Sequence, residues 1–146
     1  MTDRLFERAN ARASAELRGL VETLSAEDLV IDAGGGWTVA VLLGHLAFCD
    51  RWQVARWDGA TAAGLALPTE VSDNVADLAN AALEPTWRAL PGETAAVLAV
   101  EAAAEIDALV AALPDAAVAA GRPRLVDRSL HRLEHVAQIR RAIGHE

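Results

Sequence analysis

The chain has 146 residues and a formal charge of −8 at pH 7, with 13 basic residues, all arginine, against 21 acidic ones. This length suits one domain over residues 1–146, and the acidic balance argues against binding to nucleic acids or anionic membranes. A single cysteine excludes an internal disulfide framework. The charged N-terminus and the lack of an apolar run of about 20 residues argue against a signal peptide and a membrane span, so we expect a cytoplasmic protein.

Helix-forming residues dominate, and no alternating apolar and polar run predicts a strand. An apolar stripe predicts a first helix over residues 2–24: Leu5, Ala9, Ala13, Leu17, Leu20 and Leu24. Residues 25–36 read as a connection that ends in three glycines, and Thr38 as the N-cap of a second helix that reaches about Trp57. A stretch rich in glycine and alanine over 58–69 separates it from a third helical segment over 71–90, bent near Pro85.

The remaining sequence predicts two more helices. One covers residues 93–113, with this apolar set on its buried side: Leu98, Ala102, Ile106, Leu109 and Leu113. After turn-rich residues 114–123, the last helix runs from about Arg124 to Ile143 and stops at Gly144. Four long helices and one shorter segment predict an all-α fold, a four-helix bundle with an elaborated crossover between the second and third long helices.

Three histidines form a pattern that can bind a metal. His131 and His135 lie four residues apart in the last helix and therefore share one face. His45 lies in the second helix, inside the apolar sequence VAVLLGHLAF. If these helices are neighbours, three imidazoles converge on one ion and leave a coordination position for water or substrate.

The same histidines also allow a purely structural interpretation. The sector of His131 and His135 carries further polar residues and could face water: Arg124, Asp127, Arg128, Glu134 and Gln138. His45 alone would be a hydrogen-bonded core histidine. Gln138 and Asp127 are candidates to orient an imidazole, because histidine ligands usually need such a partner.

The other reactive or aromatic residues are less specific. Cys49, four residues after His45, reads as a small buried hydrophobe, with a fourth ligand or a nucleophile as alternatives. His145, next to the chain end, is expected to play no part. The four tryptophans are expected to pack the core or wall a pocket: Trp37, Trp52, Trp57 and Trp87.

Two segments taken together resemble the DinB-like, or YfiT-like, superfamily of bacterial four-helix metalloproteins. In GGGWTVAVLLGHLAFCDRW, residues 34–52, Trp37 and Thr38 precede His45-Leu46. In LHRLEHVAQIRRAIG, residues 130–144, the His-x-x-x-His pair precedes Gln138-Ile139. The resemblance covers most of the chain in helix order. It implies that a divalent metal ion (zinc, nickel, iron or manganese) is held by His45, His131 and His135.

Some branches of this superfamily act with low-molecular-weight thiols, among them bacillithiol-dependent transferases and the mycothiol-dependent maleylpyruvate isomerase. The isomerase branch typically has glutamate where this chain has His131, and it carries a further C-terminal domain absent here. Both departures argue against that particular activity. The resemblance therefore implies a metal-dependent thiol S-transferase or a related transferase or isomerase, and the lysine-free composition hints at mycothiol.

Other functions remain open from the sequence. The same metal site could activate water in a hydrolase, or bind an ion without catalysis in a stress-associated protein. A metal-free helical interaction module is a third possibility. Alanine-rich helix faces and the habit of relatives lead us to expect a homodimer.

Overall fold

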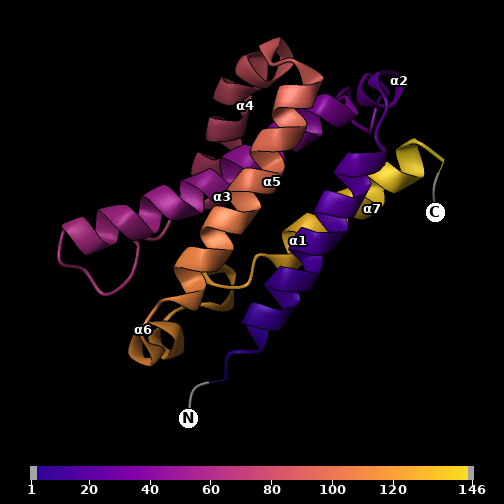
Figure 1. Cartoon of the computed structure of the whole chain (residues 1–146). Coiled ribbons are helices and arrows are strands. Elements are labelled where there is room, and N and C mark those ends of the chain that lie inside the picture. Colours follow the sequence, from indigo (N-terminus) through magenta and orange to yellow (C-terminus); the bar gives the residue numbers. More distant parts are fainter. Residues whose placement is uncertain (1–2, 145–146) are drawn as a thin grey trace.

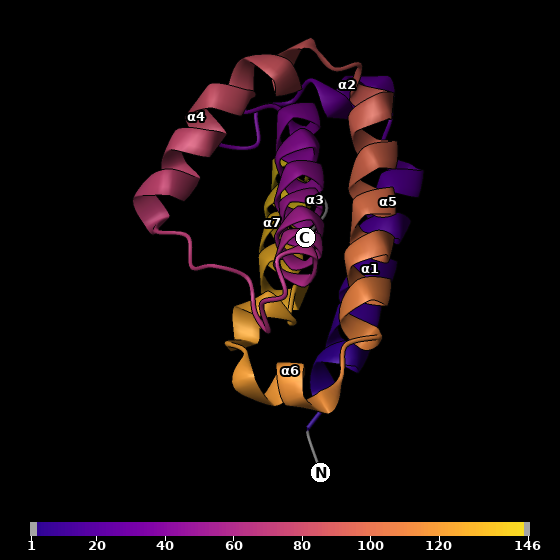
Figure 2. The same ribbon diagram turned by 90° about the vertical axis from the view of Figure 1, so that its left-hand side faces the viewer.

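The computed structural model describes residues 3–144, which form a bundle of helices (Figure 1). Its long helices are α1 (Leu5–Thr23), α3 (Val39–Ala62), α5 (Gly92–Ala111) and α7 (Ser129–Ala142). α1 packs against α5 and α7, and α3 packs against α5. Helix α4 (Asp73–Ala89), between α3 and α5 in the chain, lies outside these four and packs against α3 (Figure 2). The predicted all-α bundle with its elaborated crossover is confirmed.

Side-chain hydrogen bonds explain where α3 and α4 begin. Thr38 caps α3 as predicted, because its hydroxyl accepts a hydrogen bond from the Val41 amide at 3.2 Å. Ser72 does the same for α4, accepting from the Val75 amide at 3.2 Å. At the other end of α7, Gly144 adopts a φ of +81°, which suits its predicted role as a helix stop.

α3 is longer than predicted, and α4 is continuous across its proline. α3 continues to Ala62 instead of ending near Trp57, and the burial of Trp57 and Ala60 supplies packing that outweighs the glycine at position 59. α4 runs through Pro85 as one helix. The buried side chain of Trp87, two residues further on, holds that end of α4 in place.

The connections also contain structure that the sequence did not predict. Short helices α2 (Ala26–Leu29) and α6 (Asp115–Ala120) interrupt the first and the last of them, and a 3-10 turn, η1 (Pro123–Leu125), follows α6. The prediction that the last helix starts near Arg124 is wrong. The Asp127 carboxylate accepts hydrogen bonds from the amide and hydroxyl of Ser129, and α7 begins there.

Two leucines assigned to buried faces are exposed instead. α1 turns Phe6 and Asn10 inward, while Leu5 is 69% exposed. Leu98 of α5 is 39% exposed. α5 buries a row of small side chains, which let it approach its neighbours closely: Ala95, Ala96, Ala99, Ala102 and Ala103.

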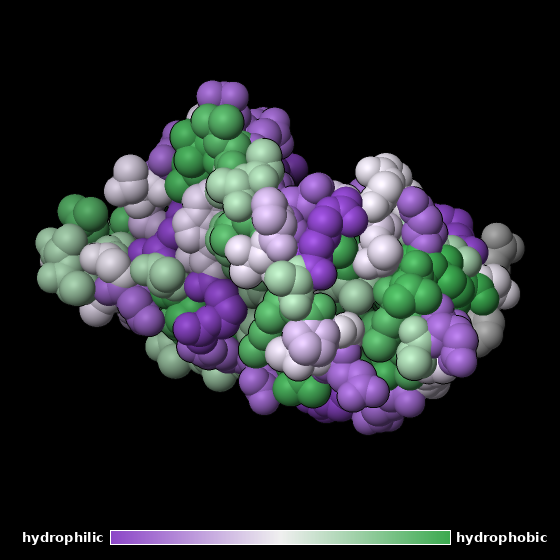
Figure 3. Space-filling view, turned by 90° about the horizontal axis from the view of Figure 1, so that it is seen from above, coloured by the Kyte–Doolittle hydropathy of each residue, from purple (hydrophilic) through white to green (hydrophobic). Residues whose placement is uncertain are grey.

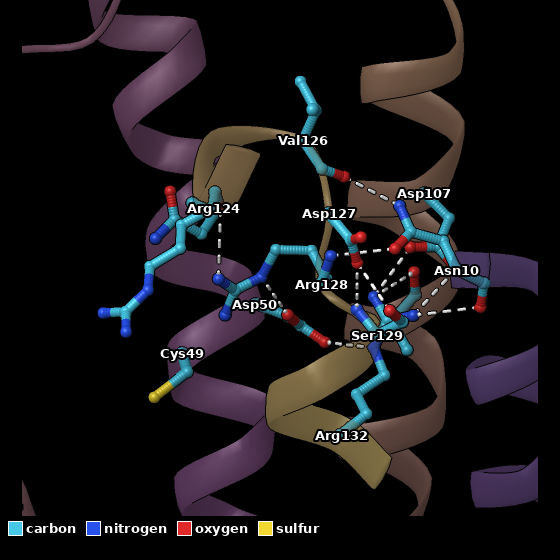
Figure 4. A network of polar contacts seen from close by, with 12 residues as sticks. Asn10, Cys49, Asp50, Asp107, Arg124, Val126, Asp127, Arg128, Ser129 and Arg132 are labelled. Carbon is cyan, nitrogen blue, oxygen red and sulfur yellow. Dashed lines mark hydrogen bonds and ion pairs between the residues drawn. The ribbon is translucent and has the colours of Figure 1, made fainter. Parts of the chain in front are cut away.

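The buried apolar side chains form two clusters with a charged network between them. One cluster surrounds Leu42 and Leu46 in the first half of α3, and the other surrounds Val54 and Trp57 in its second half. Asp50 lies between them in the sequence of α3 and is 1% exposed. A charged side chain that is this deeply buried needs ion-pair or hydrogen-bond partners. Asp50 finds them in the network of polar contacts drawn in Figure 4.

Asp50 joins α3 to α7 through two arginines. Its Oδ1 accepts from Nε of Arg128 and its Oδ2 from Nε of Arg132, each at 3.0 Å. The guanidinium of Arg132, 0% exposed, also forms a two-bond pair with Asp107 of α5, at 2.7 and 3.0 Å. Asn10 of α1 completes the network by accepting from the Arg128 amide at 2.8 Å.

The surface mixes polar and apolar side chains. The face seen in Figure 3 carries hydrophobic patches separated by hydrophilic ones. On α4, Val75 and Leu78 are 48% and 62% exposed. Among residues 3–144, no helix is both long enough and apolar enough to cross a membrane.

Removing the charge of Asp50 is expected to destabilise the fold strongly. Asp50→Asn leaves the buried Arg132 without part of its counter-charge, so the free energy of unfolding should fall by about 3–5 kcal/mol in urea titrations. Glu105→Gln is the matched control, since it breaks the exposed Arg51–Glu105 ion pair and should cost less than about 1 kcal/mol. Equal, small losses in both variants would contradict the importance of the network.

Candidate metal centre

Three imidazoles from two helices meet at one place. His45 comes from α3, and His131 and His135 come from α7. One nitrogen of each ring lies within 4.8 Å of the corresponding nitrogen of the other two. His45 is buried and the other two are half-buried, so His131 and His135 do not lie on an open solvated face.

Gln138 fixes the orientation of His135. Its Nε2 donates to the Ala33 carbonyl at 2.7 Å, and its Oε1 lies 2.9 Å from Nδ1 of His135. Because this oxygen can only accept, His135 carries its proton on Nδ1 and keeps the lone pair on Nε2. The arrangement fits a metal ligand with an orienting partner, which is the role anticipated for Gln138.

The glycine loop before α3, which contains glycines 34–36, brings the Ala33 carbonyl within hydrogen-bond distance of Gln138. The Ala33 amide donates to the Trp37 carbonyl at 2.7 Å, and the Trp37 amide donates to the Gly34 carbonyl at 3.1 Å. Glycines 34–36 all have positive φ. A side chain at Gly34 would also come within 3.3 Å of Nε2 of Gln138. Glycine there allows the loop to approach α7 closely.

Two tryptophans wall the site on the side of α4. The ring of His45 lies 5.1 Å from that of Trp37 and 5.4 Å from that of Trp87, centre to centre. The indole N–H of Trp37 donates to Glu84 of α4. Gly44 makes room for Trp87, because a Cβ there would lie 3.1 Å from its side chain. The expectation that tryptophans pack the core or wall a pocket is confirmed for these two, and also for Trp57, which is buried in the second apolar cluster.

Burial keeps two of the imidazoles neutral. Desolvation lowers the pKa of His45 to about 4, with a further decrease from His135 and an opposing contribution from a hydrogen bond with Asn80. Desolvation also lowers the pKa of His131 to about 3, helped by His135 and Arg128. Neutral imidazole is the form that binds metals.

One nitrogen of the site still needs a partner. Nδ1 of His131 is buried and has no hydrogen-bond partner within residues 3–144. A buried polar atom without a partner costs free energy, and a metal ion or water at the site would satisfy it. The donor set, its burial and this atom thus fit a cation bound among the three histidines.

Cys49 lies beside the three histidines but does not join them. Its sulfur is 3.7 Å from Nε2 of His45, yet it is not among the donors that lie within reach of one another. Burial raises the pKa of its thiol to about 12, so Cys49 stays protonated. The residue is half-buried, which is less enclosed than the small buried side chain that the sequence predicted.

The remaining sequence candidates divide clearly. Asp127 bonds to Ser129 and not to an imidazole. His145 lies outside the described residues. Sequence reasoning missed Asn80, for which no local signal exists, and Asp50, whose isolated acidic position after an apolar stretch of α3 was the available signal.

Fold and site together define a helical bundle with a three-histidine cluster that can hold a metal ion. The family model of the DinB superfamily matches residues 9–146, and the chain belongs to this superfamily. No curated protein and no solved structure matches the chain.

The metal-free protein should lose stability as the pH falls below 6.5. The folded state holds His45 and His131 with pKa values of about 4 and about 3, whereas the unfolded chain protonates histidine near 6.5. Between these values the unfolded state binds more protons, so each histidine contributes a loss of up to about 1.4 kcal/mol per pH unit. Urea titrations of chelator-treated protein at pH 7.0, 6.0 and 5.0 measure it. In His131→Gln, residue 131 cannot titrate, so the free energy of unfolding should change less steeply with pH. The same pH dependence as in the wild type would contradict this origin.

Gln138→Ala should weaken metal binding without abolishing it. The substitution removes the acceptor that fixes His135, and loss of such a partner typically costs 10–100-fold in affinity. Competition with a chromophoric zinc chelator measures the change. Glu134→Ala, at an exposed position of the same helix, is the control and should leave the affinity unchanged. Equal zinc affinities of Gln138→Ala and Glu134→Ala would show that Gln138 does not support metal binding.

Proposed function

We propose that the protein is a divalent-metal-dependent enzyme that transfers a low-molecular-weight thiol to an electrophile. Its metal would be held by His45, His131 and His135. The observation that carries the proposal is the meeting of three imidazoles, two of them kept neutral, with no fourth donor in the same cluster among residues 3–144. Catalytic metal sites characteristically have three protein ligands and an open position.

A metal bound there would supply one property, a lowered pKa of a coordinated thiol or water. The chain supplies the rest. Gln138 holds the ring of His135 in one tautomer and orientation. Trp37 and Trp87 exclude water from one side of His45, which strengthens electrostatic interactions in the site.

The proposed transfer is a substitution at carbon. The sulfur of the thiol R–SH forms a bond to the electrophilic carbon, and the leaving group departs with the electron pair of its former bond. The thiol proton passes to solvent. Cys49 is not the nucleophile in this scheme, because burial keeps its own thiol protonated.

Two alternatives use the same residues. In a hydrolase, a coordinated water replaces the thiol. In a non-catalytic metal-binding protein, a closed site with four protein ligands would staple the bundle. The position of Cys49 outside the donor cluster argues against that closed site. Mycothiol as the thiol, a homodimer and a cytoplasmic location stay predictions.

Substituting one histidine should remove metal and activity together. His45→Gln should lower bound metal from one equivalent to less than about a tenth in elemental analysis, because two imidazoles rarely retain an ion that three hold. Transfer to a chromogenic aryl halide, with mycothiol, bacillithiol or glutathione as donor, should fall in parallel. His145→Ala is the control and should behave as wild type.

The chelator experiment separates the alternatives. Chelation should abolish transfer in the wild-type protein, and zinc, nickel, iron or manganese should restore it. Transfer that is indifferent to chelator would refute the proposed enzyme. Full metal content with hydrolysis but no thiol transfer would assign the hydrolase.

A further inference from the structure

The glycine loop before α3 reaches the histidine cluster from two directions. At its start, the Ala33 carbonyl accepts from Gln138, which in turn holds His135. At its end, the ring of Trp37 lies 5.1 Å from that of His45, centre to centre. The position of this loop therefore affects one imidazole of α7 and the single imidazole of α3.

Hydrogen bonds within the loop tie these two contacts together. The Ala33 amide donates to the Trp37 carbonyl, and the Trp37 amide donates to the Gly34 carbonyl. The Gly34 amide also donates to the carboxylate of Asp32 at 2.6 Å. Because the two ends of the loop are bonded to each other, a displacement of Trp37 also displaces the Ala33 carbonyl.

Helix α4, which lies outside the four long helices (Figure 2), holds the same loop at two points. Oε1 of Glu84 accepts from the indole N–H of Trp37. One turn further along α4, Nη2 of Arg88 donates to the Gly36 carbonyl at 3.0 Å. Nε of Arg88 donates to Oε2 of Glu84 at 3.3 Å. The carboxylate of Glu84 thus joins both attachments of α4 to the loop.

The charge of Glu84 strengthens its bond to Trp37. That bond lowers the pKa of Glu84; burial raises it, and Arg88 lowers it further, so that the carboxylate is ionised at neutral pH. Hydrogen bonds to an ionised acceptor are stronger than those between neutral groups. The ion pair with Arg88 is itself partly exposed, and such pairs contribute little to stability. The contact therefore matters more for where the indole points than for the stability of the bundle.

We propose that Glu84 is a positioning residue of the metal centre and acts on His45 and His135 through Trp37 and the glycine loop. Without this carboxylate, the indole loses its acceptor on α4, and the half-buried ring can turn away from His45. The end of the loop is released at the same time, and with it the Ala33 carbonyl that holds Gln138. The inference rests on the metal centre of the proposed function, and not on thiol transfer.

Competition with a chromophoric zinc chelator measures the effect on metal binding. Glu84→Ala should weaken the zinc dissociation constant about tenfold, at the lower end of the 10–100-fold range typical for groups that orient metal ligands. Glu84→Gln should change it less than about threefold, because its amide oxygen can still accept from the indole. Asp77→Ala removes an exposed acidic residue of the same helix and should leave the affinity unchanged.

A double-mutant cycle tests whether Glu84 acts through Trp37. Trp37→Phe keeps an aromatic ring beside His45 and removes the indole N–H. It should weaken zinc binding by about tenfold, like Glu84→Ala. The combined variant should also lose about tenfold, because both changes break one contact, whereas independent effects would multiply to about a hundredfold.

The imidazole signals of the ¹⁵N-labelled, metal-free protein give a readout that needs no ion. In Glu84→Ala the signals of His45 and His135 should shift, and in Asp77→Ala they should coincide with those of the wild type. Unshifted signals would overturn the inference, as would a hundredfold loss in the combined variant. A lower Tm of Glu84→Ala with unchanged zinc affinity would mean that Glu84 only anchors α4, which also overturns it. Absence of thiol transfer with the expected zinc affinities would refute the proposed enzyme alone.

Discussion

The buried pairing of Asp50 with Arg128 and Arg132 determines how α3 and α7 face each other. Arg132 directly follows His131 and Arg128 precedes it by three residues, while Asp50 follows His45 by five residues. A shift of either helix by one turn would break these bonds and leave buried charges without partners. The network therefore fixes the helices in the register that brings the three imidazoles together. Apolar contacts alone would allow α3 and α7 to slide past each other, whereas these ion pairs do not.

Four separate segments contribute to the candidate centre, each by a different physical device. α3 and α7 supply the imidazoles. The glycine loop supplies the Ala33 carbonyl that holds Gln138. α4 supplies Trp87 and, through Glu84, the anchor for Trp37. The crossover between the second and third long helices is thus the element that shields the histidines, and this explains why an extra helix lies outside the bundle.

Much of the fold and of the candidate metal centre could be predicted from the sequence, because these features depend on local sequence patterns. The long helices follow from apolar periodicity, the cap at Thr38 from its hydroxyl, and the pairing of His131 with His135 from helical spacing. Gln138 was predictable for the same reason. The contributions of Asn80, Asp50 and Arg132 depend on contacts between distant segments, and the exposure of Leu98 depends on how closely alanines let helices pack. Apart from the isolated acidic position of Asp50 in α3, no local sequence pattern encodes these contacts or this exposure.

The coordination shell of a bound metal tests the central claim most directly. X-ray absorption at the zinc edge of the zinc-loaded protein should show three imidazole nitrogens at about 2.0–2.1 Å and one light oxygen ligand. That result would establish a three-histidine centre with an exchangeable position. A sulfur ligand at about 2.3 Å would contradict it by drawing Cys49 into a closed site, and a shell without imidazole would contradict it altogether.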